Sequence, residues 1–180
     1  EYQEERYAKW IGKNQLTDEE KEKQRKTEFT YSPLLSIITP LYNTPQNYFV
    51  DYIKSIQNQT YANWEVCLVD ASSKPLEYIE EIIKSDDRIK YKILKENKGI
   101  SENSNEAIKM AKGEFIVLVD HDDMIAENAL FEIVEKINTI PEADFLYSDE
   151  DKFENTLDDR YSPFFKPDFS PDFLRSTNYI

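Results

Sequence analysis

The sequence predicts an α/β fold in which a mostly parallel sheet is covered by helices on both faces. Short apolar segments alternate along the chain with segments whose apolar residues recur at helical spacing. The apolar segments are continuous, which is typical of strands buried on both faces of a parallel sheet. With 180 residues, 39% of them hydrophobic, the chain is long enough to bury the core of one ordinary domain.

The first thirty residues differ from the rest because they are polar and charged. Thr17–Glu20 forms a capping box, in which the Thr17 hydroxyl and the Glu20 carboxylate satisfy free N–H groups at a helix start. We therefore expect a helical arm over residues 1–32, followed by an α/β domain over residues 33–180.

The α/β domain is predicted from five apolar segments and the helical patterns between them. The predicted strands are Leu34–Ile38, Val66–Val69, Ile89–Ile93, Phe115–Val119 and Phe145–Tyr147. Helical spacing of apolar residues predicts helices within residues 49–56, 79–83, 107–111 and 129–137. Pro40 is expected to stop the first strand, and Gly113 to cap the helix that ends near residue 111.

Three prolines recur every four residues near the end of the chain, among several phenylalanines. They are Pro163, Pro167 and Pro171. Because proline disfavours helix interiors, we expect this segment to be extended, with its aromatic rings packed against the domain.

Composition excludes several classes of function. With 22 Lys and Arg against 36 Asp and Glu, the net charge of −14 argues against binding of nucleic acid or of an anionic membrane surface. Three scattered glycines exclude a P-loop and a dinucleotide-binding turn. One cysteine and one histidine exclude an internal disulfide and multi-Cys or multi-His metal sites. Any metal would therefore have mainly oxygen ligands, as Mg²⁺, Mn²⁺ or Ca²⁺ do. We find no apolar run of transmembrane length and no signal peptide.

Polar residues follow three of the predicted strands, at the edge where parallel sheets bind ligands. They are Pro40–Asn43, Asp70 and Asp120–Asp123. Asp120 and Asp122 are two residues apart, so in an extended segment both project to one side, where a divalent cation would offset their repulsion. Such a cation would bridge diphosphate oxygens. The alternatives are that the aspartates are loop or helix-capping residues and that Tyr42 is a packing aromatic.

Several segments in order carry a resemblance to a known family: SIITPLYNTP, WEVCLVDAS, ENKGISENSNEAIKMAKGEFIVLVDHDD, YSDEDK, KPDFSPD and NYI. Together they resemble family 2 glycosyltransferases of the GT-A (Rossmann-like) fold, in the bacterial, rhamnosyltransferase-like branch that builds surface polysaccharides. The resemblance covers nearly the whole chain and corresponds to the N-terminal, donor-binding part of that family.

The resemblance implies roles for five positions. Pro40 and Tyr42 correspond to the loop that holds the nucleotide base, and Asp70 to the residue that hydrogen-bonds the base. Asp120 would lie near the ribose or metal, and Asp122 would ligate the metal, Mn²⁺ or Mg²⁺. The chain departs from the family pattern after Asp70, where Ala71-Ser72 replaces an Asp-Gly pair.

The activity implied is inverting transfer of a sugar from a UDP- or dTDP-linked donor to a growing cell-surface polysaccharide, with a glycan or lipid-linked glycan as acceptor. The general base is expected beyond Ile180, so this chain is expected to bind donor without turnover. The donor's location and the absence of a visible signal peptide lead us to expect a cytoplasmic protein, with the inner face of the cell membrane as an alternative placement.

Three other classes of protein are alternatives to this interpretation. A sugar-phosphate nucleotidyltransferase would need a Gly- and Arg-rich loop after the first strand, and a phospho-acceptor receiver domain would need an acidic pair there; this chain has neither. A non-catalytic nucleotide-binding module stays open. The Asn97–Gly99 turn could approach the donor phosphates with Lys98 as a counter-charge, although turn chemistry alone explains its composition.

Overall fold

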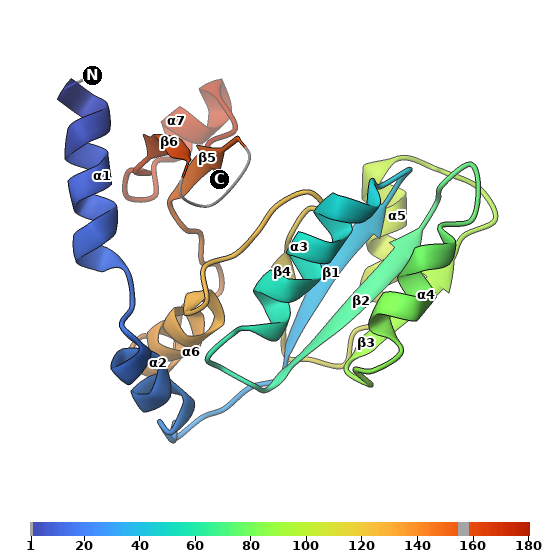
Figure 1. Ribbon diagram of the computed structural model, residues 1–180, viewed down its shortest axis with the longest axis horizontal. Coiled ribbons are helices and arrows are strands. Elements are labelled where there is room, and N and C mark those ends of the chain that lie inside the picture. Colours follow the sequence, from blue (N-terminus) through green and yellow to red (C-terminus); the bar gives the residue numbers. More distant parts are fainter. Residues whose placement is uncertain (1, 155–158) are drawn as a thin grey trace. The chain divides into compact units, whose positions relative to one another are not determined.

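A computed structural model describes residues 2–154 and 159–180 (Figure 1). The contacts within the chain group it into two units: Asp18–Pro141, and the segment up to Thr17 together with Glu142–Ile180. This grouping differs from the limits 1–32 and 33–180 expected from the sequence, and those domain limits stay a prediction.

The larger unit is built on a parallel sheet of four strands. These are β1 (Leu35–Leu41), β2 (Trp64–Asp70), β3 (Ile89–Ile93) and β4 (Phe115–Leu118). Their order is β3-β2-β1-β4, and every neighbouring pair is parallel. The α/β class and the parallel sheet predicted from the sequence are confirmed, and the carboxyl ends of all four strands share one edge.

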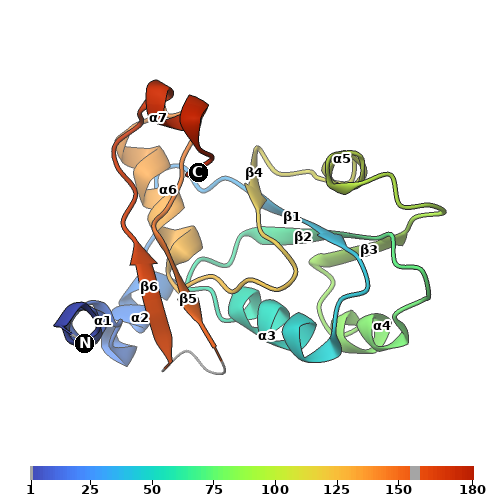
Figure 2. The ribbon, with the colours of Figure 1, turned by 90° about the horizontal axis from the view of Figure 1, so that it is seen from above.

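Helices cover both faces of this sheet. They are α3 (Gln46–Gln57), α4 (Glu77–Ile83), α5 (Ile100–Ile108) and α6 (Ala129–Thr139). Figure 2 shows α5 on one face of the sheet and both α3 and α4 on the other. Alternation along β2 divides its side chains between two cores: Val66 and Leu68 belong to the larger core with α3 and α4, and Cys67 and Val69 to a smaller one with α5.

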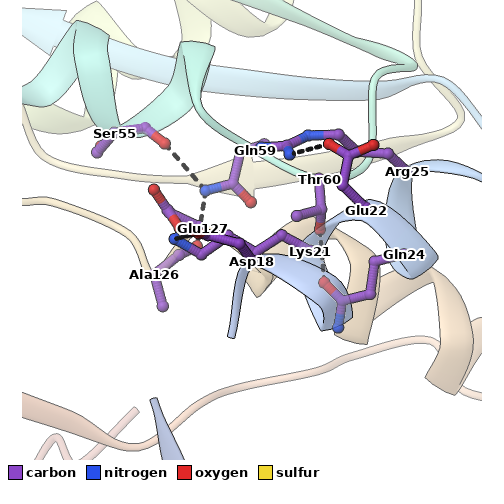
Figure 3. A network of polar contacts seen from close by, with 10 residues as sticks. All are labelled: Asp18, Lys21, Glu22, Gln24, Arg25, Ser55, Gln59, Thr60, Ala126 and Glu127. Atoms are coloured by element: carbon purple, nitrogen blue, oxygen red, sulfur yellow. Dashed lines mark hydrogen bonds and ion pairs between the residues drawn. The ribbon is translucent and has the colours of Figure 1, made fainter. Parts of the chain in front are cut away.

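The short helix α2 (Asp18–Arg25) belongs to the same unit as the sheet. Thr60 Oγ1 donates a hydrogen bond of 2.8 Å to Gln24 Oε1, and Lys21 forms an ion pair with Glu127 (Figure 3). Gln59 joins the loop after α3 to the loop before α6, because its amide group donates a hydrogen bond of 2.7 Å to the carbonyl of Ala126. These polar contacts fasten α2 to the loops that follow α3 and precede α6.

The smaller unit combines helix α1 (Tyr2–Asn14), a hairpin of β5 (Glu150–Phe153) and β6 (Arg160–Phe164), and helix α7 (Pro171–Ser176). The hairpin strands are antiparallel. Trp10 of α1 packs edge-on against Phe165, with ring centroids 5.1 Å apart. Among the described residues α1 is the longest helix, at 13 residues, and none is long and apolar enough to cross a membrane.

Two predicted strand limits are wrong. The first strand does not stop at Pro40, because β1 continues to Leu41. The pairing between β1 and β4 ends at Ile38–Leu118, two residues before Pro40. The N–H that Pro40 lacks is therefore not missing from the hydrogen-bond ladder with β4. Phe145–Tyr147 forms no strand, and β5 begins only at Glu150. In this segment the contacts come from aromatic rings: Tyr147 packs against Tyr179, with ring centroids 5.9 Å apart.

Two further expectations, about proline and glycine, are corrected. The proline-rich segment is not extended throughout, because Pro171 opens helix α7 and Ser170 Oγ caps it by accepting from the Phe173 N–H. Gly113 does not cap α5, which ends at Ile108, and its φ is not positive. Its lack of a side chain matters for a different reason, a close approach of the backbone to β1.

Candidate functional site

A cavity of about 280 Å³ lies at the carboxyl ends of the parallel strands. Three segments form its walls: Pro40–Tyr42 at the end of β1, the turn and first residues of α5 from Asn97 to Asn103, and Asp120–Asp122 after β4. The structure therefore gathers four of the five predicted site residues, Pro40, Tyr42, Asp120 and Asp122, around one cavity. This is the strand edge at which ligands bind in open α/β sheets.

The β1 wall presents an aromatic ring. Tyr42 is 49% exposed, so one face of its ring is available to a ligand. The next residue, Asn43, has a φ of 50°, a left-handed conformation that asparagine adopts more readily than most residues. The chain therefore turns sharply directly after Tyr42.

The β4 wall carries the carboxylates. Although the β1–β4 ladder ends at Leu118, Thr39 Oγ1 donates to the carbonyl of Val119 at 2.8 Å and holds the chain directly before Asp120. Asp120 and Asp122 are both exposed, the side chain of Asp122 by 58%. No Lys or Arg is among the residues that line the cavity, so its fixed charges are negative.

His121 lies between the two aspartates in sequence and also lines the cavity. Its Nδ1 atom is buried without a hydrogen-bond partner and lies 3.8 Å from Asp122 Oδ1, too far for a hydrogen bond. The imidazole therefore packs beside the acidic pair without a hydrogen bond from Nδ1 to Asp122.

The third wall is built by paired asparagines at the start of α5. Asn97 Oδ1 accepts from the Gly99 N–H and from Asn103 Nδ2, both at 2.9 Å. Gly99 has a φ of 89°, which a residue with a side chain adopts at a cost. Lys98 is not part of this wall, and its ammonium group pairs with Glu96 at 3.0 Å.

Asn103 lines the cavity but is not among the site residues predicted from the sequence. It is 4% exposed and hydrogen-bonded to the turn before α5, so it holds the wall from within. The sequence signal that could have identified it is its position in the segment GISENSNEA, which carries part of the family resemblance.

Asp70 lies outside the lining of the cavity. It shares the strand face of Val66 and Leu68, toward α4, and is 1% exposed. Its carboxylate accepts from the Tyr91 hydroxyl at 2.7 Å and from the Ser72 N–H at 2.8 Å. Burial, followed by the hydrogen bond to Asp70, raises the pKa of Tyr91, so its phenol stays protonated and keeps donating.

The acidic pair fits one mode of divalent-metal binding. Within the described parts of the chain, no three His, Cys, Asp or Glu side chains are grouped to hold a metal by themselves. Mg²⁺ is commonly held by one or two carboxylates together with substrate phosphates, and Mn²⁺ accepts the same hard oxygen ligands. Asp120 and Asp122, lining one cavity, would supply the protein's part of such a ligand set.

The comparisons with known proteins agree with this geometry. The family model of glycosyl transferase family 2 matches residues 36–178. The chain belongs to that family.

Three proteins with similar sequences or structures illustrate this match. The O-antigen biosynthesis protein RfbC of Myxococcus xanthus is 32% identical over 82% of this chain and 12% of its own length. A Campylobacter jejuni GalNAc(5)-diNAcBac-PP-undecaprenol beta-1,3-glucosyltransferase is 36% identical over 59% of this chain and 35% of its own. The structure of Staphylococcus aureus TarS 1-349 in complex with UDP-GlcNAc matches with a TM-score of 0.54 and 30% identity, over 58% of this chain and 31% of that one.

The chain is short beside such relatives. It spans only 16% and 12% of the length of two relatives that it matches over 151 residues each. The family and the GT-A-type α/β fold follow from these matches. The activity of the whole protein does not follow from them and is proposed below.

Proposed function

We propose that this chain forms the donor site of a glycosyltransferase that moves a sugar from a UDP- or dTDP-linked donor onto a cell-surface polysaccharide. The observation that carries the proposal is the cavity itself, which Tyr42, Asp120 and Asp122 line together at the carboxyl edge of the sheet. The TarS structure was determined with UDP-GlcNAc bound, which supports a uridine nucleotide as the first candidate.

Charge supports a divalent cation in this site. A nucleoside diphosphate is an anion, and the lining contributes two carboxylates and no Lys or Arg. Bringing the diphosphate beside Asp120 and Asp122 without a cation would place like charges together in a partly enclosed space. We propose that Asp122, with Asp120, holds Mn²⁺ or Mg²⁺. Such an ion stabilises the charge that develops on a departing diphosphate.

The remaining walls have roles in the same proposal. The half-exposed ring of Tyr42, beside Pro40, offers a face on which a nucleotide base can stack. The turn at Asn97–Gly99 presents a wall without a long side chain at Gly99, which lets a ligand approach the backbone closely.

We propose that transfer inverts the anomeric configuration and that the general base is supplied from beyond Ile180. A base on the acceptor side takes the hydroxyl proton as that oxygen attacks the anomeric carbon opposite the diphosphate. The name of the Campylobacter relative includes an undecaprenol-linked glycan, which supports a glycan or lipid-linked glycan as acceptor. A lipid-linked acceptor would place the reaction at the cytoplasmic face of the cell membrane.

Calorimetric titration of this chain with UDP and dTDP, each with and without Mn²⁺, tests the donor-site proposal. We expect binding that needs Mn²⁺ and that Asp122→Asn weakens by at least tenfold. Asp144→Asn, an exposed aspartate outside the cavity lining, is the matched control and should bind as the unaltered chain does. Failure of the folded chain to bind either nucleotide with Mn²⁺ would contradict the proposal.

A further inference from the structure

His121 lies in a tight turn between the two aspartates of the candidate site. The backbone N–H of Asp123 donates to the carbonyl of Asp120 at 3.2 Å, which places His121 and Asp122 at the two central positions of the turn. The chain that enters this turn is held to β1 through the Val119 carbonyl. The backbone around His121 is therefore fixed, whereas the side chain of Asp122 is 58% exposed and has room to move.

The Nδ1 atom of His121 lacks the hydrogen-bond partner that buried polar atoms normally have. Among the described residues, the only other buried side-chain nitrogen or oxygen in this condition is Thr44 Oγ1. Asp122 Oδ1 lies 3.8 Å from Nδ1. A neutral imidazole carries its one proton on either nitrogen. Because a carboxylate oxygen attracts an N–H and repels a nitrogen lone pair, this neighbour favours the tautomer with the proton on Nδ1.

We infer that His121 is a positioning residue for the proposed cation: its Nδ1–H donates to Asp122 and orients that carboxylate toward the ion. This inference rests on the proposed function for the cation, although the choice of tautomer does not. A carboxylate has about four lone-pair positions, so Asp122 can accept from Nδ1 and still ligate an ion. Direct ligation through Nδ1 is disfavoured because that atom is buried, and the described residues hold no group of three His, Cys, Asp or Glu side chains that could bind a metal.

Two substitutions of His121 separate the role of Nδ1 from that of Nε2. The amide nitrogen of asparagine is as many bonds from the backbone as Nδ1, and that of glutamine reaches as far as Nε2. We expect His121→Gln to weaken Mn²⁺ binding in the presence of UDP by about tenfold or more, the usual effect of losing a hydrogen bond to a metal ligand, and His121→Asn by less than about threefold. Electron paramagnetic resonance of free Mn²⁺ measures both affinities, and urea unfolding checks that both variants fold. Equal losses in the two variants, or a larger loss in His121→Asn, would overturn the inference.

A double variant tests whether His121 acts through Asp122. Once Asp122→Asn is present, His121→Gln should cause little further loss of Mn²⁺ affinity, because both substitutions remove the same contact. A full additional loss in the double variant would show that His121 acts on the ion by another route, which would overturn the inference.

Nitrogen nuclear magnetic resonance of the unaltered chain tests the contact without any substitution. His121 is the one histidine of the chain, so labelling histidine with ¹⁵N gives the two ring signals of this residue alone. We expect the proton on Nδ1, both in the nucleotide-free chain and with UDP and Mg²⁺ added. A proton on Nε2 instead would overturn the inference. If the unaltered chain binds no cation with UDP, the proposed function fails, and the ring signals still decide whether Nδ1 is the donor.

Discussion

The backbone N–H of Gly113 donates a hydrogen bond of 2.8 Å to Ser36 Oγ, which joins the segment before β4 to β1. The approach leaves no room for a side chain. A Cβ added at Gly113 would lie 2.4 Å from the carbonyl oxygen of Leu34 and 2.6 Å from Ser36 Oγ. Since β1 and β4 carry two walls of the candidate site, this contact at the amino ends of the strands supports the geometry at their carboxyl ends.

Gly113→Ala should therefore destabilise the sheet. We expect the free energy of unfolding in urea to fall by about 1–3 kcal/mol, the usual cost of overpacking. Gly12→Ala in α1 is the control, because nothing lies within 4 Å of the added Cβ and alanine favours helix over glycine by about 0.5–1 kcal/mol. Equal effects of the two substitutions would contradict the close approach.

Glu65 should make stability depend on pH. Burial alone would raise its pKa, but hydrogen bonds from Lys90, the Lys112 N–H and Ser36 outweigh burial and lower the pKa below its ordinary value of 4.5. Because the folded-state pKa is the lower one, Glu65 stabilises the fold fully above pH 4.5, and this contribution is lost as the pH falls through the folded-state value.

Glu65→Gln removes that dependence. We expect the variant to lose about 1–3 kcal/mol at pH 7, the cost of breaking a partly buried charged hydrogen-bond network. Its free energy of unfolding should also fall less steeply below pH 4.5 than that of the unaltered chain. Urea unfolding at a series of pH values measures both effects, and identical slopes for the two proteins would count against the network.

The Tyr42 ring should contribute to nucleotide affinity by stacking. We expect Tyr42→Ala to weaken UDP binding with Mn²⁺ by about 5- to 150-fold, since an aromatic stacked on a base contributes about 1–3 kcal/mol. Tyr42→Phe should retain most of the affinity because it keeps the ring. Tyr48→Ala is the matched control, a tyrosine of 50% exposure that does not line the cavity. Equal losses in Tyr42→Ala and Tyr48→Ala would contradict a stacking role.

Most of the fold could be predicted because its signals are local. β1 and β2 are buried and mostly apolar, β3 alternates apolar residues with lysines, β4 is a short apolar run, and the helices between them keep apolar residues at helical spacing. The roles of Pro40 and Gly113 do not follow from local sequence, because they depend on neighbours distant in the chain: Pro40 on where β4 stops pairing with β1, and Gly113 on how closely Leu34 and Ser36 approach it.

The candidate site was predictable where residues follow a strand directly. Tyr42, Asp120 and Asp122 come at strand ends, and topology alone places strand ends at one edge. Asp70 also ends a strand, but it is 1% exposed, accepts a hydrogen bond from the Tyr91 hydroxyl, and is not among the residues that line the cavity. The sequence pattern does not give the burial of a residue at a strand end, so this difference had to come from the structure.

The central claim, a cation-assisted nucleotide site between Tyr42 and the Asp120–Asp122 pair, is tested most directly by paramagnetic broadening. Nuclear magnetic resonance spectra of the isotope-labelled chain would be recorded with UDP while Mn²⁺ is added in small amounts. We predict that the amide signals of Tyr42, Gly99 and His121 broaden first, while those of Ser36 and Gly113 at the far end of the sheet persist. Broadening centred on any other acidic segment, or none at these three residues, would contradict the account.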